Sequence, residues 1–240
     1  MEMQTTDKIL PAQKWKLPAW IDSPSITNRN SHAEQNALKS VDDVLLGYVG
    51  KDAGGMDHFF DECFSAIKNL CLKGVGVEIG AGVSILSTYV VRNYTEVKNI
   101  YAVEVVPKVV DLLQPIILRS NVESWSGTIT PVTGSFDEME LEDASQDFCV
   151  EYASLHHSDD LLVTITEIAR VLKPGGLLFM IDRVHHNRLS DQQRELMLNL
   201  EYSQQWLKGN GYDCERLTRR VNGEHEYRHS EWMEVLDKSG

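Results

Sequence analysis

A chain of 240 residues in which 42% are hydrophobic has enough apolar side chains for one sizeable domain. Its 36 acidic and 23 basic residues give a net charge of −13, and such a surface would repel a phosphate backbone. We therefore expect no nucleic-acid partner. The four cysteines lack C-x-x-C spacing, which argues against a zinc site or a disulfide framework. We expect no metal.

The N-terminal stretch is polar and lacks the apolar centre of a signal peptide. No apolar run reaches the roughly 18 residues that a membrane span requires. We expect a cytoplasmic protein with no membrane partner. The composition leaves the oligomeric state open.

Tryptophans and prolines alternate near the start of the chain. Trp15 and Trp20 lie between Pro11, Pro18 and Pro24, a pattern typical of an irregular arm that packs on a domain. A disordered leader is the alternative, and both remain open. The division that we expect along the chain is an N-terminal arm or cap over residues 1–55, an α/β core over 56–182, and a C-terminal substrate cap with the last helix over 183–240.

From Val75 onward, short apolar runs alternate with longer amphipathic stretches. Continuous apolar runs are typical of strands that are covered on both faces. The alternation predicts a Rossmann-like α/β fold, with a mostly parallel sheet and helices on both faces. The predicted strands are Val75–Ile79, Ile100–Val103, Thr128–Val132, Phe148–Tyr152 and Leu177–Ile181. Predicted helices cover Met56–Leu72, Val109–Ile117, Leu161–Leu172 and Ser190–Lys208, and another begins near Ser84.

The first strand runs into a glycine-containing turn, Glu78-Ile79-Gly80-Ala81-Gly82-Val83-Ser84. Glycines at such a turn allow a ligand to approach the backbone, and the following helix N-terminus favours a carboxylate or phosphate. The dinucleotide pattern G-x-G-x-x-G would require glycine where Ile85 stands, which disfavours an NAD-dependent oxidoreductase.

An acidic residue ends the second strand. Glu104 follows the glycine turn by about two dozen residues, where a carboxylate can accept both hydrogen bonds of a ribose diol. A carboxylate that caps a helix is the alternative for this residue. The turn and Glu104 together favour an adenosine-containing ligand at the carboxyl edge of the sheet.

These segments resemble the class I S-adenosylmethionine (SAM)-dependent methyltransferases of small-molecule type. Glu78-x-Gly80-x-Gly82 is similar to the family's first motif, and Glu104-x-x-Pro107 to its second. The stretch from Glu167 to Gly176, with Lys173-Pro174-Gly175-Gly176 at its end, resembles the turn before the fifth strand. Similar segments also occur at Gly134–Asp137 and Leu155–His157. The resemblance covers Val75 to Asp182.

The resemblance implies SAM as cofactor and assigns site residues. The backbone of Gly80 and Gly82 would hold the methionine end of SAM, with Glu78 supporting its amino group indirectly. Glu104 would bind the ribose hydroxyls. Ser135 and Phe136 would flank the adenine, while Glu151 and Tyr152 would lie near the sulfonium.

Three features depart from the family pattern. Ser84 stands where a third glycine is frequent, although a serine there can cap the helix. Ser135 replaces a frequent aspartate, which weakens the case for a carboxylate on the adenine amino group. Ser230–Gly240 reads as the last helix, so the family's C-terminal edge strands would be truncated unless Tyr212–Val221 supplies one. We expect that segment to cover strand five, or the chain to associate through it.

Polar residues follow the fifth strand, including Arg183, His185 and His186, and others lie between Glu224 and Arg228. They could bind a polar, anionic or sugar-like substrate, or form a solvated loop whose charges pair with one another. If a hydroxyl is methylated, His156 and His185 are the candidate bases. We expect His157 to be structural.

Three functions remain open on this sequence. The leading hypothesis is an EC 2.1.1-type transferase that methylates an O, N or C atom of a small polar metabolite or biosynthetic intermediate. The alternatives are a non-catalytic SAM-binding or partner protein that retains the fold, and an NAD-dependent oxidoreductase.

Overall fold

The structure is a computed structural model that describes residues 5–50, 55–120, 122–209, 212 and 214–239. The helices are α1 Pro24–Ala37, α2 Val41–Val49, α3 Gly55–Ser65, α4 Ile85–Asn93, α5 Gln114–Ser120, α6 Leu161–Val171, α7 Asp191–Leu198, α8 Gln204–Gly209 and α9 His229–Ser239. The strands are β1 Gln13–Lys14, β2 Gly74–Ile79, β3 Val97–Glu104, β4 Thr128–Thr133, β5 Gln146–Tyr152 and β6 Leu172–Ile181. Within this described part, no helix combines the length and apolar character needed to cross a membrane.

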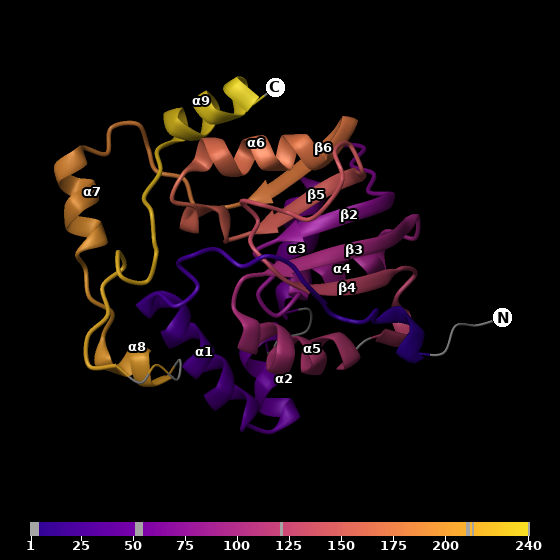
Figure 1. The fold of residues 1–240 in the computed structure, drawn as a ribbon, viewed down its shortest axis with the longest axis horizontal. Coiled ribbons are helices and arrows are strands. Elements are labelled where there is room, and N and C mark those ends of the chain that lie inside the picture. Colours follow the sequence, from indigo (N-terminus) through magenta and orange to yellow (C-terminus); the bar gives the residue numbers. More distant parts are fainter. Residues whose placement is uncertain (1–4, 51–54, 121, 210–211, 213, 240) are drawn as a thin grey trace.

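The strands form one six-stranded sheet in the order β1-β4-β3-β2-β5-β6, with every pair parallel (Figure 1). From the central strand β2, the chain first builds outward to β3 and β4 and then returns to add β5 and β6 on the other side. This reversal opens a crevice at the carboxyl end of β2, where ligands bind in open α/β sheets. The Rossmann-like fold predicted from the sequence is confirmed.

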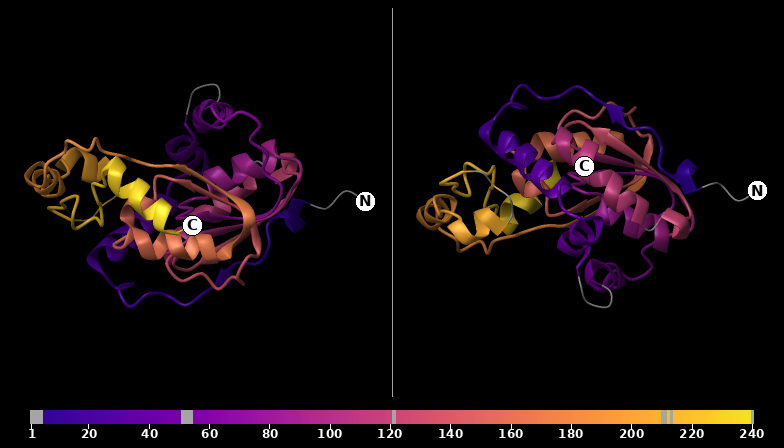
Figure 2. Two further views of the ribbon diagram at one scale, coloured as in Figure 1. Left: turned by 90° about the horizontal axis from the view of Figure 1, so that it is seen from above. Right: turned by 90° about the horizontal axis from the view of Figure 1, so that it is seen from below.

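Helices cover both faces of the sheet, as Figure 2 shows in its two views. On one face, Phe60 and Phe64 of α3 and Tyr89 of α4 pack against strand residues such as Ile100 and Phe148. On the other face, α6 and Trp232 of α9 pack over Val77, Ile79 and Cys149. Because the central strands are buried on both sides, their sequences read as continuous apolar runs.

Each predicted strand is present, but three helices differ from the prediction. The one predicted over Val109–Ile117 begins as a π-helix, Val109–Leu113, and continues as α5. Helix α3 ends at Ser65, because the chain then makes turns and Asn69 takes a left-handed φ of 62°. The helix predicted over Ser190–Lys208 is two helices, α7 and α8. They are interrupted around Glu201, which forms an antiparallel bridge with Thr218.

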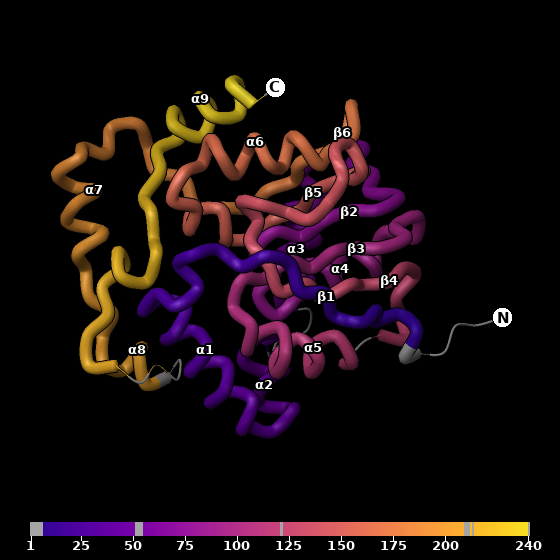
Figure 3. The backbone as a smooth tube through the Cα atoms, viewed as in Figure 1, coloured from indigo at the N-terminus to yellow at the C-terminus, as the bar shows by residue number. Residues whose placement is uncertain are grey.

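The N-terminal segment packs as an arm. Strand β1 pairs with β4, and the Trp15 backbone N–H donates to the Thr133 carbonyl at 2.9 Å. Figure 3 shows this indigo segment continuing from β1 to α1. The packed-arm alternative is confirmed over these described residues, while α1 was not predicted. Ser23 caps that helix and Pro24 begins it, which is a common start for a helix.

Among the described residues, β6 pairs with β5 alone and forms one edge of the sheet. Tyr212–Val221, apart from residue 213 outside the described residues, lies beside α7 and α8, where Thr218 faces Glu201. Of the two outcomes expected for strand five, coverage by this segment was wrong, since its hydrogen bonds go to the Leu198–Tyr202 stretch instead, and association of the chain through that strand stays a prediction. The last helix, α9, packs on α6 as the sequence indicated, although Gly240 lies outside the described residues.

The packing of the arm makes one stability prediction. Trp15 is 6% exposed and contacts Tyr101, with their ring centroids 6.4 Å apart. We expect Trp15→Ala to lower the free energy of unfolding by about 3–5 kcal/mol, because it removes a buried aromatic side chain. Trp20→Ala, at a position 41% exposed in the same arm, should cost less than about 1 kcal/mol. Urea unfolding of both variants measures the two free energies of unfolding. Equal losses of stability would contradict a specific packing role for Trp15.

Candidate functional site

The turn after β2 takes a conformation that its glycines allow. Gly80 has a φ of 59° and Gly82 a φ of 51°, both in the left-handed region. A Cβ on Gly80 would lie 2.2 Å from the Ser154 Cβ, so the side chain is excluded there by close packing. A Cβ on Gly82 would meet no atom within 4 Å, which leaves open space on that side of the turn.

Ser84 does not cap α4. It stands at the N-cap position with a φ of 67°, and its side chain makes no capping hydrogen bond. Its Oγ is buried without a hydrogen-bond partner. The expectation that Ser84 caps the helix was wrong, because the left-handed backbone turns its hydroxyl away from the N–H groups of the helix. The conformation is the one that a glycine would adopt without strain.

Glu78 lies beneath the turn at the end of β2 and is 3% exposed. Its carboxylate accepts hydrogen bonds from the Ser87 backbone N–H, at 2.9 Å, and from the Ser87 hydroxyl. Burial raises the pKa of Glu78 to about 8, and the two bonds from Ser87 offset only part of this effect. The residue ties α4 to the strand and lines the cavity described below.

Glu104 ends β3 and binds the glycine turn directly. Its Oε2 accepts from the Gly82 N–H at 2.9 Å, and its Oε1 accepts from the Val106 N–H at 2.8 Å. Burial raises the pKa of Glu104, while these hydrogen bonds and the charge of Arg29 oppose the rise. The carboxylate thus organises the turns after β2 and β3, and each oxygen keeps a second lone pair for a ligand.

The turn after β4 holds Ser135, Phe136 and Asp137 along the cavity. The Ser135 Oγ accepts from the Asp137 N–H at 3.2 Å. The Asp137 carboxylate also accepts from the Thr164 hydroxyl, and burial raises its pKa. Sequence reasoning noted that Ser135 lacks a carboxylate. It missed that Asp137 brings one to the same wall two residues later.

The two residues predicted at the end of β5 have different positions. Tyr152 lines the cavity and packs edge-on against Phe60, with centroids 5.3 Å apart. Glu151 is fully buried and is not among the residues that line the cavity. Its Oε1 accepts from the Ser154 N–H at 2.5 Å, so this carboxylate holds the turn after β5. Burial raises its pKa well above the ordinary value, with Asp182 adding to the rise.

These turns form one wall of a cavity of about 570 Å³. Helices α1 and α2 and the cap loop around Asn222 form the opposite wall. Arg29, His32 and Tyr48 come from the helices, and Tyr212 and Asn222 from the cap. Sequence reasoning missed this second wall, since α1 is polar and carries no apolar stripe. The Ser23-Pro24 pair was the one signal that a helix begins there.

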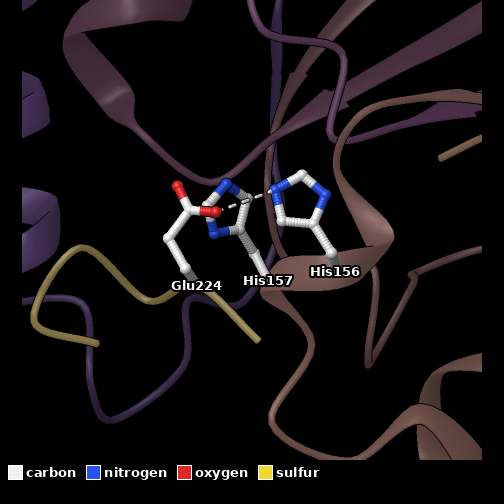
Figure 4. A group of neighbouring side chains, drawn as sticks. All are labelled: His156, His157 and Glu224. Atoms are coloured by element: carbon white, nitrogen blue, oxygen red, sulfur yellow. Dashed lines mark ion pairs between the residues drawn. The ribbon is translucent and has the colours of Figure 1, made fainter. Parts of the chain in front are cut away.

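His156 and His157 lie in the turn after β5, facing Glu224 of the cap (Figure 4). The His156 Nδ1 lies 2.6 Å from the Asp182 Oδ1, and its Nε2 lies 3.5 Å from Glu224. His156 does not line the cavity, whereas His157 does. The His157 Nδ1 lies 2.8 Å from the Gly223 carbonyl, as a structural residue would.

The ligand atoms of His156, His157 and Glu224 lie within 4.8 Å of one another. Two guanidinium groups already contact this cluster. Arg183 pairs with Glu224 at 2.5 Å, and an Arg29 nitrogen lies 3.0 Å from the His157 Nε2. Burial, together with Arg29 and His156, lowers the pKa of His157 to about 3. A metal ion would have to bind against these positive charges, so the donor set fits a cation poorly.

His185 and the polar residues after β6 lie outside the cavity lining. His185 pairs with Glu226, Arg219 pairs with the same carboxylate, and Arg228 pairs with Asp191 at 2.5 Å. These charges pair with one another, as the second alternative predicted, but Glu224 and Glu226 are buried and the stretch is not a solvated loop. The substrate-binding interpretation of this stretch stays a prediction, since its ionic groups already pair with one another and do not line this cavity.

Taken together, the fold and the cavity define an α/β protein with a candidate ligand site at the carboxyl edge of a parallel sheet, where an adenosine-type cofactor is expected. Residues 77–180 match the family model described as a methyltransferase domain. This match and the shared fold support a class I SAM-dependent methyltransferase domain over these residues, with SAM as its expected cofactor. The NAD-dependent alternative is set aside by this match.

Solved structures share the fold at low sequence identity. The YcgJ protein of Bacillus subtilis has a TM-score of 0.55 and 18% identity, over 76% of this chain and 67% of its own. The phosphoethanolamine N-methyltransferase 2 of Haemonchus contortus, in complex with SAM, has a TM-score of 0.55 and 16% identity, over 92% of this chain and 43% of its own. SpnF, described as a [4+2]-cyclase, has a TM-score of 0.59 and 17% identity, over 95% of this chain and 74% of its own. No curated protein matches the sequence significantly.

The cavity fits SAM on the evidence of its own residues. Gly82 faces open space, and the buried carboxylates of Glu78 and Glu104 and the partly buried carboxylate of Asp137 lie along one wall. A ligand that carries a sulfonium and an ammonium group would lower the cost of keeping such carboxylates ionised.

The burial of Glu78 makes a prediction about pH. Its pKa is about 8 in the folded protein and 4.5 ordinarily, so between these values the folded state binds more protons than the unfolded state. Stability is therefore lost as the pH rises through this window. We expect Glu78→Gln to stabilise the ligand-free protein more at pH 8 than at pH 5, by about 2–4 kcal/mol. Urea unfolding at the two pH values measures this, and an equal effect at both would contradict it.

Proposed function

We propose that this protein is a methyltransferase of the EC 2.1.1 type that transfers a methyl group from SAM to an O, N or C atom of a small polar metabolite or biosynthetic intermediate. The single observation that supports it most is the cavity of about 570 Å³ between the motif residues and the cap. A volume of this order accommodates the cofactor and a small acceptor better than a macromolecule.

The roles that we propose for the cofactor wall follow its geometry. Glu104 binds the ribose hydroxyls, and the backbone of Gly80 and Gly82 holds the methionine end. Ser135 and Phe136 flank the adenine, with Asp137 as an acceptor for its amino group. When bound, SAM supplies an electrophilic methyl group on a positively charged sulfur. The contribution of this chain is to hold the acceptor in line with that methyl group and to exclude water.

In this proposal Glu78 and Glu151 do not touch the reacting atoms but position the turns around them through neighbouring serines. Glu78 fixes the first turn of α4 through Ser87, and Glu151 fixes the turn after β5 through Ser154. Tyr152 lines the cavity beside that turn, where the sulfonium would lie.

A hydroxyl acceptor would need a base. We keep His156 and His185 as proposals, and the geometry favours His156. Asp182 holds the His156 Nδ1 at 2.6 Å, which leaves Nε2 as the proton acceptor. The His156 ring lies beside that of His157, which lines the cavity, with their centroids 4.3 Å apart. His185 is engaged by Glu226.

One neighbour supports a second candidate function. SpnF shares this fold and is described as a [4+2]-cyclase, so the fold by itself does not guarantee methyl transfer. The second candidate is a protein that binds SAM without transferring its methyl group. We further propose a cytoplasmic location, which the free thiols of Cys63, Cys71 and Cys149 support. The division into arm, core and cap at 1–55, 56–182 and 183–240 is likewise a proposal.

The assignment of Glu104 makes a prediction about cofactor affinity. We expect Glu104→Ala to weaken binding of SAM by about 2–4 kcal/mol, because two charge-assisted hydrogen bonds to the ribose are lost. Glu104→Gln retains an acceptor oxygen and should have a smaller effect. Glu138→Ala, at an exposed carboxylate, is the control. Calorimetry measures the affinity. A variant that is less stable but binds SAM with unchanged affinity would instead favour a purely structural role for Glu104.

The reaction itself is tested with SAM that carries a labelled methyl group. We expect label to appear in a low-molecular-weight compound when the protein is incubated with the small-molecule fraction of a cell extract. Mass spectrometry identifies the labelled compound. The Glu104→Ala variant should give less label. Binding of SAM without labelled product in any fraction would favour the second candidate function.

A further inference from the structure

One arginine in the cavity has no acidic partner. Arg29 lies on α1 and is the one lysine or arginine among the described residues that line the cavity. Its Nη2 contacts the His157 ring and lies 3.3 Å from the Asn222 carbonyl oxygen, which are uncharged groups. Its Nε is buried with no hydrogen-bond partner. The guanidinium therefore retains an unused donor and has no ion pair within the described part of the chain, although its charge also acts on the Glu104 carboxylate.

The other arginines show that this arrangement is unusual for the chain. Those that pair with a carboxylate within 4 Å are Arg92, Arg170, Arg183, Arg194, Arg216, Arg219, Arg220 and Arg228. Arg119 and Arg188 are exposed to solvent. Within the described part of a chain of net charge −13, Arg29 is the partly buried arginine without an ion pair. A partly buried charge without an ion pair is costly unless a ligand supplies the counter-charge.

The surroundings of Arg29 are mostly apolar or aromatic. Trp20, Ile26, Tyr48 and Tyr212 line the same part of the cavity, which arises from the arm, α1, α2 and the cap. His32 lines it as well, stacked on Tyr212 at 5.2 Å. Burial, with Lys39 and Arg29, lowers the pKa of His32 to about 4, so this imidazole is neutral at neutral pH. Arg29 is thus the positive group that faces an apolar chamber.

The acidic lining residues lie elsewhere. Glu78, Glu104 and Asp137 belong to the cofactor wall, on the turns after β2, β3 and β4. Asp159 also lines the cavity, but its side chain is 82% exposed and pairs with His225. The carboxylate of SAM has a separate candidate site at the first turn of α4, whose N–H groups lack helical acceptors. Arg29 is then available for a second anion.

We propose that the methyl acceptor is a small organic acid whose anionic group pairs with Arg29 and whose apolar body lies against Trp20, Tyr48 and Tyr212. This inference rests on the proposed function, since it names the substrate class of the same cavity. The planar guanidinium provides paired N–H donors that match a carboxylate. The aromatic walls exclude water from that pair and strengthen it.

The test uses full-length protein saturated with S-adenosylhomocysteine, the demethylated product of SAM. Benzoate is titrated by calorimetry and compared with benzyl alcohol, which lacks the charge, and with acetate, which lacks the ring. We expect benzoate to bind more tightly than either compound. Arg29→Gln should weaken benzoate by about tenfold or more, to the level of benzyl alcohol, and Arg29→Lys should lose less. Arg119→Gln, at an exposed arginine, should leave benzoate binding unchanged.

The outcomes separate this inference from the proposed function. If S-adenosylhomocysteine binds but benzoate is no tighter than benzyl alcohol, the inference fails while the cofactor site stands. If Arg29→Gln weakens S-adenosylhomocysteine about tenfold but spares 5′-methylthioadenosine, which lacks the amino-acid part, Arg29 serves the cofactor carboxylate instead. If neither nucleoside binds the folded wild-type protein, the proposed function fails first. Thermal unfolding of each variant verifies that it is folded.

Discussion

The contact between Glu104 and the backbone N–H of Gly82 is the constraint on which the site depends. It joins the tips of two adjacent parallel strands, and its second oxygen accepts from Val106. The turn after β2 must then leave the sheet with positive φ values, and α4 begins where that turn ends. Because the strand order reverses beside β2, the same contact lies at the floor of the crevice that the cavity occupies.

The cofactor wall could be predicted because its signals are local in sequence. Strands buried on both faces read as apolar runs, and Gly80, Gly82 and Glu104 follow such runs directly. The predictions failed where a side chain's role depends on a distant partner. Ser84 was expected to cap a helix but takes a left-handed backbone, and Tyr212–Val221 was expected on the sheet edge but pairs beside α7.

The substrate wall could not be predicted for the same reason. Arg29 and His157 are separated by 128 positions, and no periodic pattern in α1 indicates that the two meet. The charged residues after β6 were attractive candidates because they follow a strand end. In the folded chain, however, Arg183 and Glu224 neutralise each other at 2.5 Å. Arg29 has no ion pair, and it is recognised as a candidate ligand-binding residue only when the other ion pairs of the folded chain are known.

The rings that join the cap to the N-terminal helices have a kinetic consequence. Tyr202, Trp206, Tyr212 and His32 stack in succession, with centroid distances of 4.2, 5.5 and 5.2 Å. The last two rings also line the cavity. A molecule that passes between cap and α1 must therefore part aromatic faces rather than break an ion pair. Such contacts are insensitive to ionic strength, so salt should alter how fast an anion reaches the entrance, but scarcely how long it stays inside.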